Sequence, residues 1–159
     1  MEFVLPAASL QEIDYIVQHL YPPASSATPY ATEYERTVLF IGELYVDCNV
    51  NAIGRAFAGK PWAYEFSVPP GYHTYDLPYT FYDGASERVS NDTVAVDMQT
   101  YFVSFVVHGD PNAGSVLPRL PRYRSTSNML NLTDTGFHAV VDPAANVRCE
   151  YWTKPGGCP

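Results

Sequence analysis

The sequence is poor in charge and has no long apolar run. Charged residues make up 16% of the 159 positions, below the roughly 25% typical of soluble domains. No segment approaches the roughly 18 consecutive apolar residues that a membrane span needs, so we expect no transmembrane segment. Nine basic residues stand against 17 acidic ones, a net charge of −8. We therefore expect no nucleic-acid partner, because binding phosphates requires a basic surface.

Motifs that carry chemistry are also missing. The sequence contains no G-x-S-x-G nucleophile elbow, no H-E-x-x-H zinc motif and no glycine-rich phosphate loop. The segment nearest to an elbow, 84–88, lacks the closing glycine and a preceding apolar strand, so we interpret it as a surface turn. No two histidines are spaced like metal ligands, and we expect no metal and no cofactor. The four histidines are His19, His73, His108 and His138.

Cysteines and targeting signals are sparse. At most one internal disulfide can form, with one thiol left over, because the cysteines number three. They are Cys48, Cys149 and Cys158. The first residues do not resemble a signal peptide, since they lack a basic start and their apolar run stops at Pro6. Two N-x-S/T sequons, at Asn91 and Asn131, are candidate glycosylation sites.

Aromatic residues, in contrast, are abundant. The chain has 13 Tyr, eight Phe and two Trp, whereas disordered chains are rich in charge and poor in aromatics. Its length suits one domain, with about 150 residues per domain as the guide. We therefore expect a folded chain whose aromatic rings are buried.

Apolar spacing predicts four helices. A capping box at Ser9 starts a helix that runs to about Leu20. A second helical stretch covers 32–57 and is broken near Gly42, and a third runs from Asn91 or Asp92 to about Val107. A last helix is expected to start at Asp142-Pro143, with proline at the first helical position. The apolar side of 32–57 comprises Leu39, Ile41, Leu44, Val46, Val50, Ile53 and Phe57, and that of the third helix comprises Val94, Met98, Tyr101, Phe102, Phe105 and Val106.

Three segments read as strands: 62–68, 129–132 and 138–141. Helices alternating with strands indicate the α/β class, but so few strands make a poor independent sheet. His73 follows the first strand and a Pro-Pro-Gly turn, so it lies on a loop at a strand's carboxyl end, where sites gather in α/β sheets. It is either the last member of a Ser-acid-His triad or a surface histidine beside Asp76.

Around His73 the chain resembles the type-B carboxylesterase/lipase family, which includes the cholinesterases and has the α/β-hydrolase fold. The resemblance rests on an ordered set of segments and is greatest to fungal members. They are A-F-A-G-K-P-W-A-Y-E-F at 56–66, G-Y-H-T-Y-D-L-P-Y-T-F at 71–81, M-Q-T-Y-F-V-S-F at 98–105, G-D-P-N at 109–112 and C-E-Y-W at 149–152. It implies that the chain, 1–159, is the C-terminal part of one α/β-hydrolase domain, with few strands, several helices and an incomplete sheet.

The resemblance also implies site residues. It places the triad histidine at His73, within H-x-x-[DE]-[LI], and a disulfide between Cys48 and Cys149; Cys158 has no counterpart. It implies a secreted protein and, in the full-length enzyme, a small-molecule or lipid ester as substrate. The family's nucleophile, oxyanion hole and triad acid all precede this region, so we expect no turnover by the chain alone. The upstream acids are interpreted as helix-surface charge: Glu33, Glu35, Glu43 and Asp47.

Two other interpretations remain open at this point. The chain is then either a non-catalytic, secreted interaction module derived from the same scaffold, or an unrelated small α/β binding domain. We also expect low solubility or partial disorder of the chain expressed alone, because an incomplete sheet exposes an edge and an apolar face.

Overall fold

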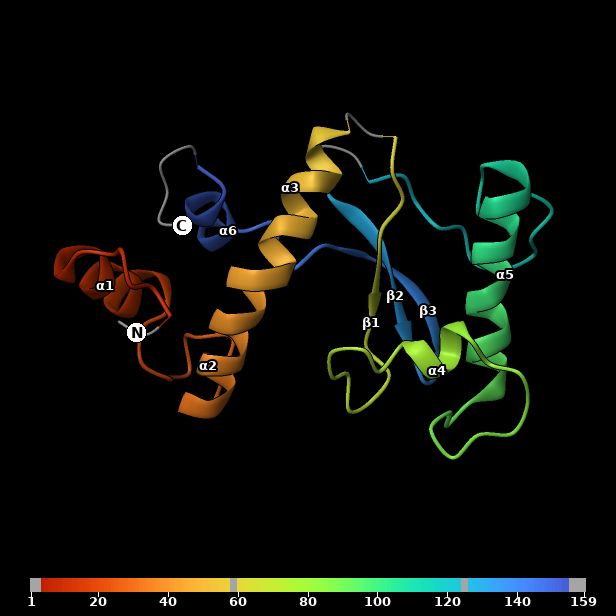
Figure 1. The fold of residues 1–159 in the computed structure, drawn as a ribbon, viewed down its shortest axis with the longest axis horizontal. Coiled ribbons are helices and arrows are strands. Elements are labelled where there is room, and N and C mark those ends of the chain that lie inside the picture. The colour runs from red at the N-terminus through yellow and green to blue at the C-terminus, as the bar shows by residue number, and fades with distance from the viewer. Residues whose placement is uncertain (1–3, 58–59, 124–125, 155–159) are drawn as a thin grey trace. The chain divides into compact units, whose positions relative to one another are not determined.

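The structure is a computed structural model that describes residues 4–57, 60–123 and 126–154. The chain divides into two compact units. We call residues 1–56 and 142–159 the helical unit, and residues 57–141 the sheet unit. Figure 1 labels the elements of both, and each unit is described by itself below.

The helical unit confirms the first two predicted helices. Helix α1 (Leu10–Tyr15) continues as a π-helical segment, η1 (Ile16–Leu20), and begins at the predicted capping box. Helix α2 (Glu33–Gly42), the π-helical segment η2 (Glu43–Asp47) and helix α3 (Cys48–Ala56) follow one another without a gap. The predicted break near Gly42 is therefore a change of helix type. The core of this unit comprises Leu5, Ile16, Leu20, Tyr21 and Phe40.

The predicted apolar side of the second helix is only partly buried. Leu39, Ile41 and Leu44 pack against the core, but four later members are about half exposed: Val46, Val50, Ile53 and Phe57. The π-helical turn at η2 explains this difference. Its i→i+5 hydrogen bonds add a residue to the turn, which rotates the side chains of the helix that follows. Apolar positions predicted at 3.6 residues per turn therefore no longer point at the core.

The last helix, α6 (Val147–Trp152), starts later than the sequence predicts. Asp142 forms a turn instead: its Oδ1 accepts from the backbone N–H of Ala144 at 2.7 Å. The helix begins after Asn146, whose Oδ1 accepts from the N–H groups of Arg148 and Cys149 at 2.8 and 3.0 Å. An asparagine N-cap thus outweighs the preference of Pro143 for the first helical turn.

The sheet unit contains a three-stranded sheet in the order β1-β2-β3. Strand β1 (Tyr64–Phe66) is parallel to β2 (Asn128–Thr133), which is antiparallel to β3 (Gly136–Val141). All three strands were expected, although β1 is shorter than 62–68. Among the described residues β1 pairs with β2 alone, so its outer edge has no strand beside it. The unit therefore has a partial α/β fold, as predicted.

Helices α4 (Leu77–Thr80) and α5 (Asp92–His108) complete the sheet unit. Figure 1 shows α5 running beside the sheet. Aromatic pairs join them: Tyr64 of β1 lies 5.7 Å from Phe102, and Trp62 lies 5.7 Å from Phe105, between ring centroids. The shared core comprises Val68, Tyr79, Val89, Val94, Ala95, Met98, Tyr101, Leu120, Leu130, Leu132 and Phe137.

The predicted buried face of α5 is wrong at its C-terminal end. Phe105 and Val106 are 50% and 81% exposed, and Ser104 is buried instead. The Ser104 hydroxyl lies 2.9 Å from the carbonyl oxygen of Asp110 and 3.0 Å from that of Ala113. The chain therefore returns along the Ser104 side after α5 ends, which sequence spacing does not show.

In the described part of the chain, no helix is both long and apolar enough to span a bilayer.

Candidate functional site

His73 lies on an exposed loop between β1 and α4. Two successive turns shape this loop: the N–H of Tyr75 donates to the carbonyl of Tyr72 at 2.9 Å, and that of Leu77 donates to Thr74 at 3.1 Å. Within the ranges that the structure describes, no group hydrogen-bonds the His73 imidazole. Both ring nitrogens thus remain available to groups outside this loop.

Both ends of the loop are anchored. On the strand side, the N–H of Gly71 donates to the carbonyl of Val68 at 2.8 Å, and Val68 is fully buried. On the helix side, the Asp76 carbonyl accepts from the N–H of Thr80 at 2.8 Å and from its hydroxyl at 3.0 Å. The Tyr64 hydroxyl also donates to Asp76 Oδ2 at 3.3 Å. Hydrogen bonds at both ends therefore hold the His73 turn between β1 and the start of α4.

The hydrogen bond between Tyr64 and Asp76 has a defined donor. Burial, followed by the negative charge of Asp76, raises the pKa of Tyr64 to about 12. The phenol is therefore neutral and acts as the donor. Sequence reasoning missed this contact because the two residues are 12 positions apart on different elements, and no local pattern links them.

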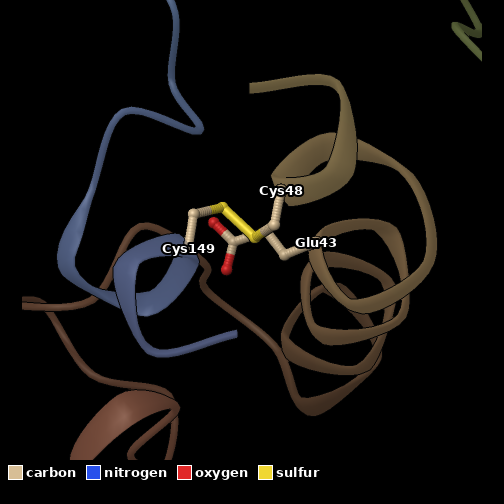
Figure 2. A group of neighbouring side chains, drawn as sticks. All are labelled: Glu43, Cys48 and Cys149. Carbon is tan, nitrogen blue, oxygen red and sulfur yellow. A yellow bond between two sulfur atoms is a disulfide. The ribbon is translucent and has the colours of Figure 1, made fainter. Parts of the chain in front are cut away.

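A disulfide joins Cys48 at the start of α3 to Cys149 of α6. It is the pairing that the family resemblance implies, across 101 positions of sequence. Figure 2 shows the carboxylate of Glu43 beside the bond between the two sulfurs. Cys158 lies outside the described residues. The disulfide thus ties the last helix of the chain to the long α2–α3 segment.

Glu43 is not surface charge, which corrects the prediction. Its residue is 2% exposed. Arg148 donates to it from Nε and Nη2, both at 2.7 Å, and the hydroxyl of Tyr21 and the amide of Asn146 donate at 2.6 and 2.9 Å. Burial alone would raise the pKa of Glu43, but the hydrogen bonds from Arg148 and Tyr21 outweigh it and lower the pKa. The other three acids, Glu33, Glu35 and Asp47, are exposed as expected.

The cluster at the disulfide does not fit a metal. Ligand atoms of Glu43, Cys48 and Cys149 lie within 4.8 Å of one another. Cysteine binds zinc and similar ions as the thiolate, but both sulfurs are joined in the disulfide. The carboxylate oxygens already accept four hydrogen bonds from three side chains. We therefore assign the cluster a structural role.

Replacing Cys48 and Cys149 together with alanine is expected to destabilise the chain by about 2–4 kcal/mol, because the open chain gains entropy when unfolded. Urea unfolding of the double variant and of the oxidised wild type measures the difference. Adding a reductant to the wild type should lower its stability similarly, and should leave the double variant unchanged. Equal stability of the two oxidised proteins would contradict the prediction.

The two sequon asparagines have different surroundings. Asn91 caps α5: its Oδ1 accepts from the N–H groups of Thr93 and Val94, and its amide donates to the carbonyl of Asp134 at 2.9 Å. Asn131 lies inside β2, where its buried Oδ1 has no hydrogen-bond partner among the residues that the structure describes. The remaining histidines are exposed: His19, His108 and His138.

Comparisons with known proteins agree with the resemblance seen in the sequence. No model of a known protein family matches the chain. It is 36% identical over 137 residues to a carboxylesterase, patB, of Aspergillus clavatus, covering 85% of this chain and 24% of that protein. It is also 36% identical over 139 residues to the patB carboxylesterase of Penicillium expansum, with the same coverage. The chain thus spans about a quarter of the length of these relatives.

The fold has a counterpart among solved structures. The crystal structure of Aspergillus niger EstA superposes with a TM-score of 0.77 at 20% identity, covering 95% of this chain and 34% of EstA. At that identity the likeness shows the fold alone. Together, sequence and fold show that the chain is similar to the C-terminal portion of a fungal carboxylesterase.

Proposed function

We propose that residues 1–159 are the C-terminal segment of a single carboxylesterase domain, and that His73 is its triad histidine. The observation that carries this proposal is the combination of carboxylesterase relatives with an exposed imidazole on an anchored loop after a parallel strand. That position is where α/β hydrolases keep the last residue of the triad. Exposed apolar side chains and the open edge of β1 suit contact with the rest of such a domain.

In the complete domain His73 transfers protons. Its neutral imidazole takes the proton of a serine hydroxyl as the serine oxygen attacks the ester carbonyl carbon. The imidazolium then gives that proton to the departing alkoxide, which leaves as the alcohol. In the second half, the imidazole takes a proton from water, whose oxygen attacks the acyl-serine, and returns it to the serine as the acid leaves. The serine, the oxyanion donors and the triad acid belong to the rest of the domain.

By this proposal the 159-residue chain has no turnover of its own. It contains no G-x-S-x-G serine, and without a nucleophile no acyl-enzyme forms. The substrate in the complete enzyme is a small-molecule or lipid ester. The protein follows the secretory route, in keeping with the disulfide, and carries glycan at Asn91 or Asn131. Asn91 is the better glycan acceptor, because a glycosylated amide keeps one N–H for the carbonyl of Asp134, and its Oδ1 still accepts the capping hydrogen bonds from Thr93 and Val94.

A chimera tests the proposed function. In it, this chain replaces the matching 137-residue segment of the Aspergillus clavatus carboxylesterase. We expect the chimera to hydrolyse a p-nitrophenyl ester and to be labelled stoichiometrically by a fluorophosphonate, because it joins the chain's histidine to the relative's remaining residues. The chain alone should show neither activity nor labelling.

Two results would overturn the proposal. One is a folded chimera with a melting transition like that of the relative but no esterase activity. The other is stoichiometric labelling of the chain alone, which would place a reactive nucleophile within it. The intact relative, assayed beside the chimera, sets the scale for both measurements.

A further inference from the structure

The residue after His73 adopts a backbone conformation that its type rarely tolerates. Thr74 has φ of 68°, in the left-handed region where an L-residue's Cβ crowds the following carbonyl oxygen. A β-branched residue there is a genuine outlier. The Thr74 side chain is exposed, so packing around it does not impose this conformation.

The hydrogen bonds of the loop impose it. Thr74 is the third residue of the turn closed by Tyr75 and Tyr72, and the first residue of the turn closed by Leu77. A positive φ at the third position is typical of a type II turn, which favours glycine there. At the preceding position with a positive φ, the chain does have a glycine: Gly71 has φ of 66°. At 74 it keeps a threonine instead.

The anchors of the loop hold the strained residue in place. Upstream, the N–H of Gly71 donates a hydrogen bond to the carbonyl of Val68, which is fully buried. Downstream, Asp76 starts α4 and accepts a hydrogen bond from Tyr64 of β1. Strained residues persist only where their surroundings over-determine them, and they cluster at functional sites. Here the strain lies directly beside the imidazole, within the loop that presents it.

We propose that Thr74 is a positioning residue for His73. The branch at its Cβ narrows the backbone conformations of the turn, so the anchored loop presents the imidazole in one orientation. Glycine at 74 would fit the same turn without strain but would also admit many others. The strain at Thr74 lowers the stability of the loop, and the narrowed backbone fixes the orientation of His73. This inference rests on the proposed role of His73 in ester hydrolysis.

Steady-state kinetics of the chimera described above test the proposal. We expect Thr74→Gly to lower kcat about tenfold, since small misplacements of a catalytic group are costly, with KM within twofold and no fall in the melting temperature. Thr74→Val keeps the branched Cβ and should retain more of kcat than Thr74→Gly. Ser127→Gly is the control for relieving a positive φ away from the site, because Ser127 has φ of 50° and lies, buried, on the segment before β2.

The outcomes separate the two proposals. If His73→Ala leaves the chimera active, the proposed function fails. If His73→Ala inactivates it and Thr74→Gly has the kcat of the parent or of Ser127→Gly, only the positioning role fails. A lower kcat for Thr74→Val than for Thr74→Gly would also overturn it, because the branch would then not be the cause.

A second measurement does not depend on activity. In the 159-residue chain, ¹⁵N relaxation reports the order of the His73 amide. We expect Thr74→Gly to lower its order parameter, and Ser127→Gly to leave it unchanged. An equally ordered His73 amide in wild type and Thr74→Gly would contradict the proposal, whether or not the chimera folds.

Discussion

Replacing His73 with alanine is expected to lower kcat of the chimera by about 10⁴-fold or more, with little change in its melting temperature. By the proposed mechanism, no group removes the serine proton or protonates the leaving alkoxide without the imidazole, and only the oxyanion hole and substrate binding still act. Because His73 is exposed and has no hydrogen-bond partner within the described ranges, its loss leaves the packing intact. Ester hydrolysis under steady-state conditions measures the effect.

His138 provides the matched control. It is an exposed histidine of the same sheet unit, on β3. His138→Ala should keep kcat within about twofold, as expected for a surface substitution away from a site. A His73→Ala chimera with more than a tenth of the parental kcat would show that another group serves as the base.

Replacing Arg148 with alanine is expected to destabilise the helical unit by about 3–5 kcal/mol. Arg148 forms a bidentate ion pair with the buried Glu43. Its removal leaves a buried carboxylate without its counter-charge, which is among the more costly single changes in proteins. Urea unfolding at pH 7 measures the loss. Arg55→Ala, at an exposed arginine of α3, should change stability by less than about 0.5 kcal/mol.

The pH dependence distinguishes this ion pair from simple packing. Folding lowers the pKa of Glu43 below its ordinary value of 4.5. Its ionised form therefore stabilises the folded wild type above that pH, and this contribution is lost as the pH falls through the lowered pKa. In Arg148→Ala the remaining burial penalty favours protonated Glu43. The difference between wild type and variant should thus shrink in acid; a difference that is constant from pH 7 to pH 3.5 would contradict the ion-pair explanation.

Local sequence signals located most of the elements. The capping box at Ser9 and the N-cap Asn91 fixed two helix starts, because such signals act within one turn of the chain. The strand predictions held for β2 and β3, and β1 is shorter than the predicted 62–68. The last helix start was misplaced because Asp142-Pro143 and Asn146 offer competing local signals, and only the observed turn at Asp142 decides between them.

Burial was predicted less well than helix position. The π-helical turn at η2 and the return of the chain past Ser104 both changed which side of a helix faces the core. Glu43 was misjudged for a related reason: the four hydrogen bonds that its carboxylate accepts come from residues 22, 103 and 105 positions away. No local pattern contains that information.

By itself the sequence determined the class of the fold, the positions of most helices and strands, the absence of a serine elbow and the resemblance that singled out His73 and the Cys48–Cys149 pair. These features are encoded in short-range spacing and in ordered motifs. Only the tertiary structure decided that Glu43 is a buried, fully bonded carboxylate, that Tyr64 anchors Asp76, and that Thr74 holds a left-handed turn beside His73. The physical reason is that these hydrogen bonds and this strain depend on which distant segments come into contact. The spacing of residues along the chain does not predict those contacts.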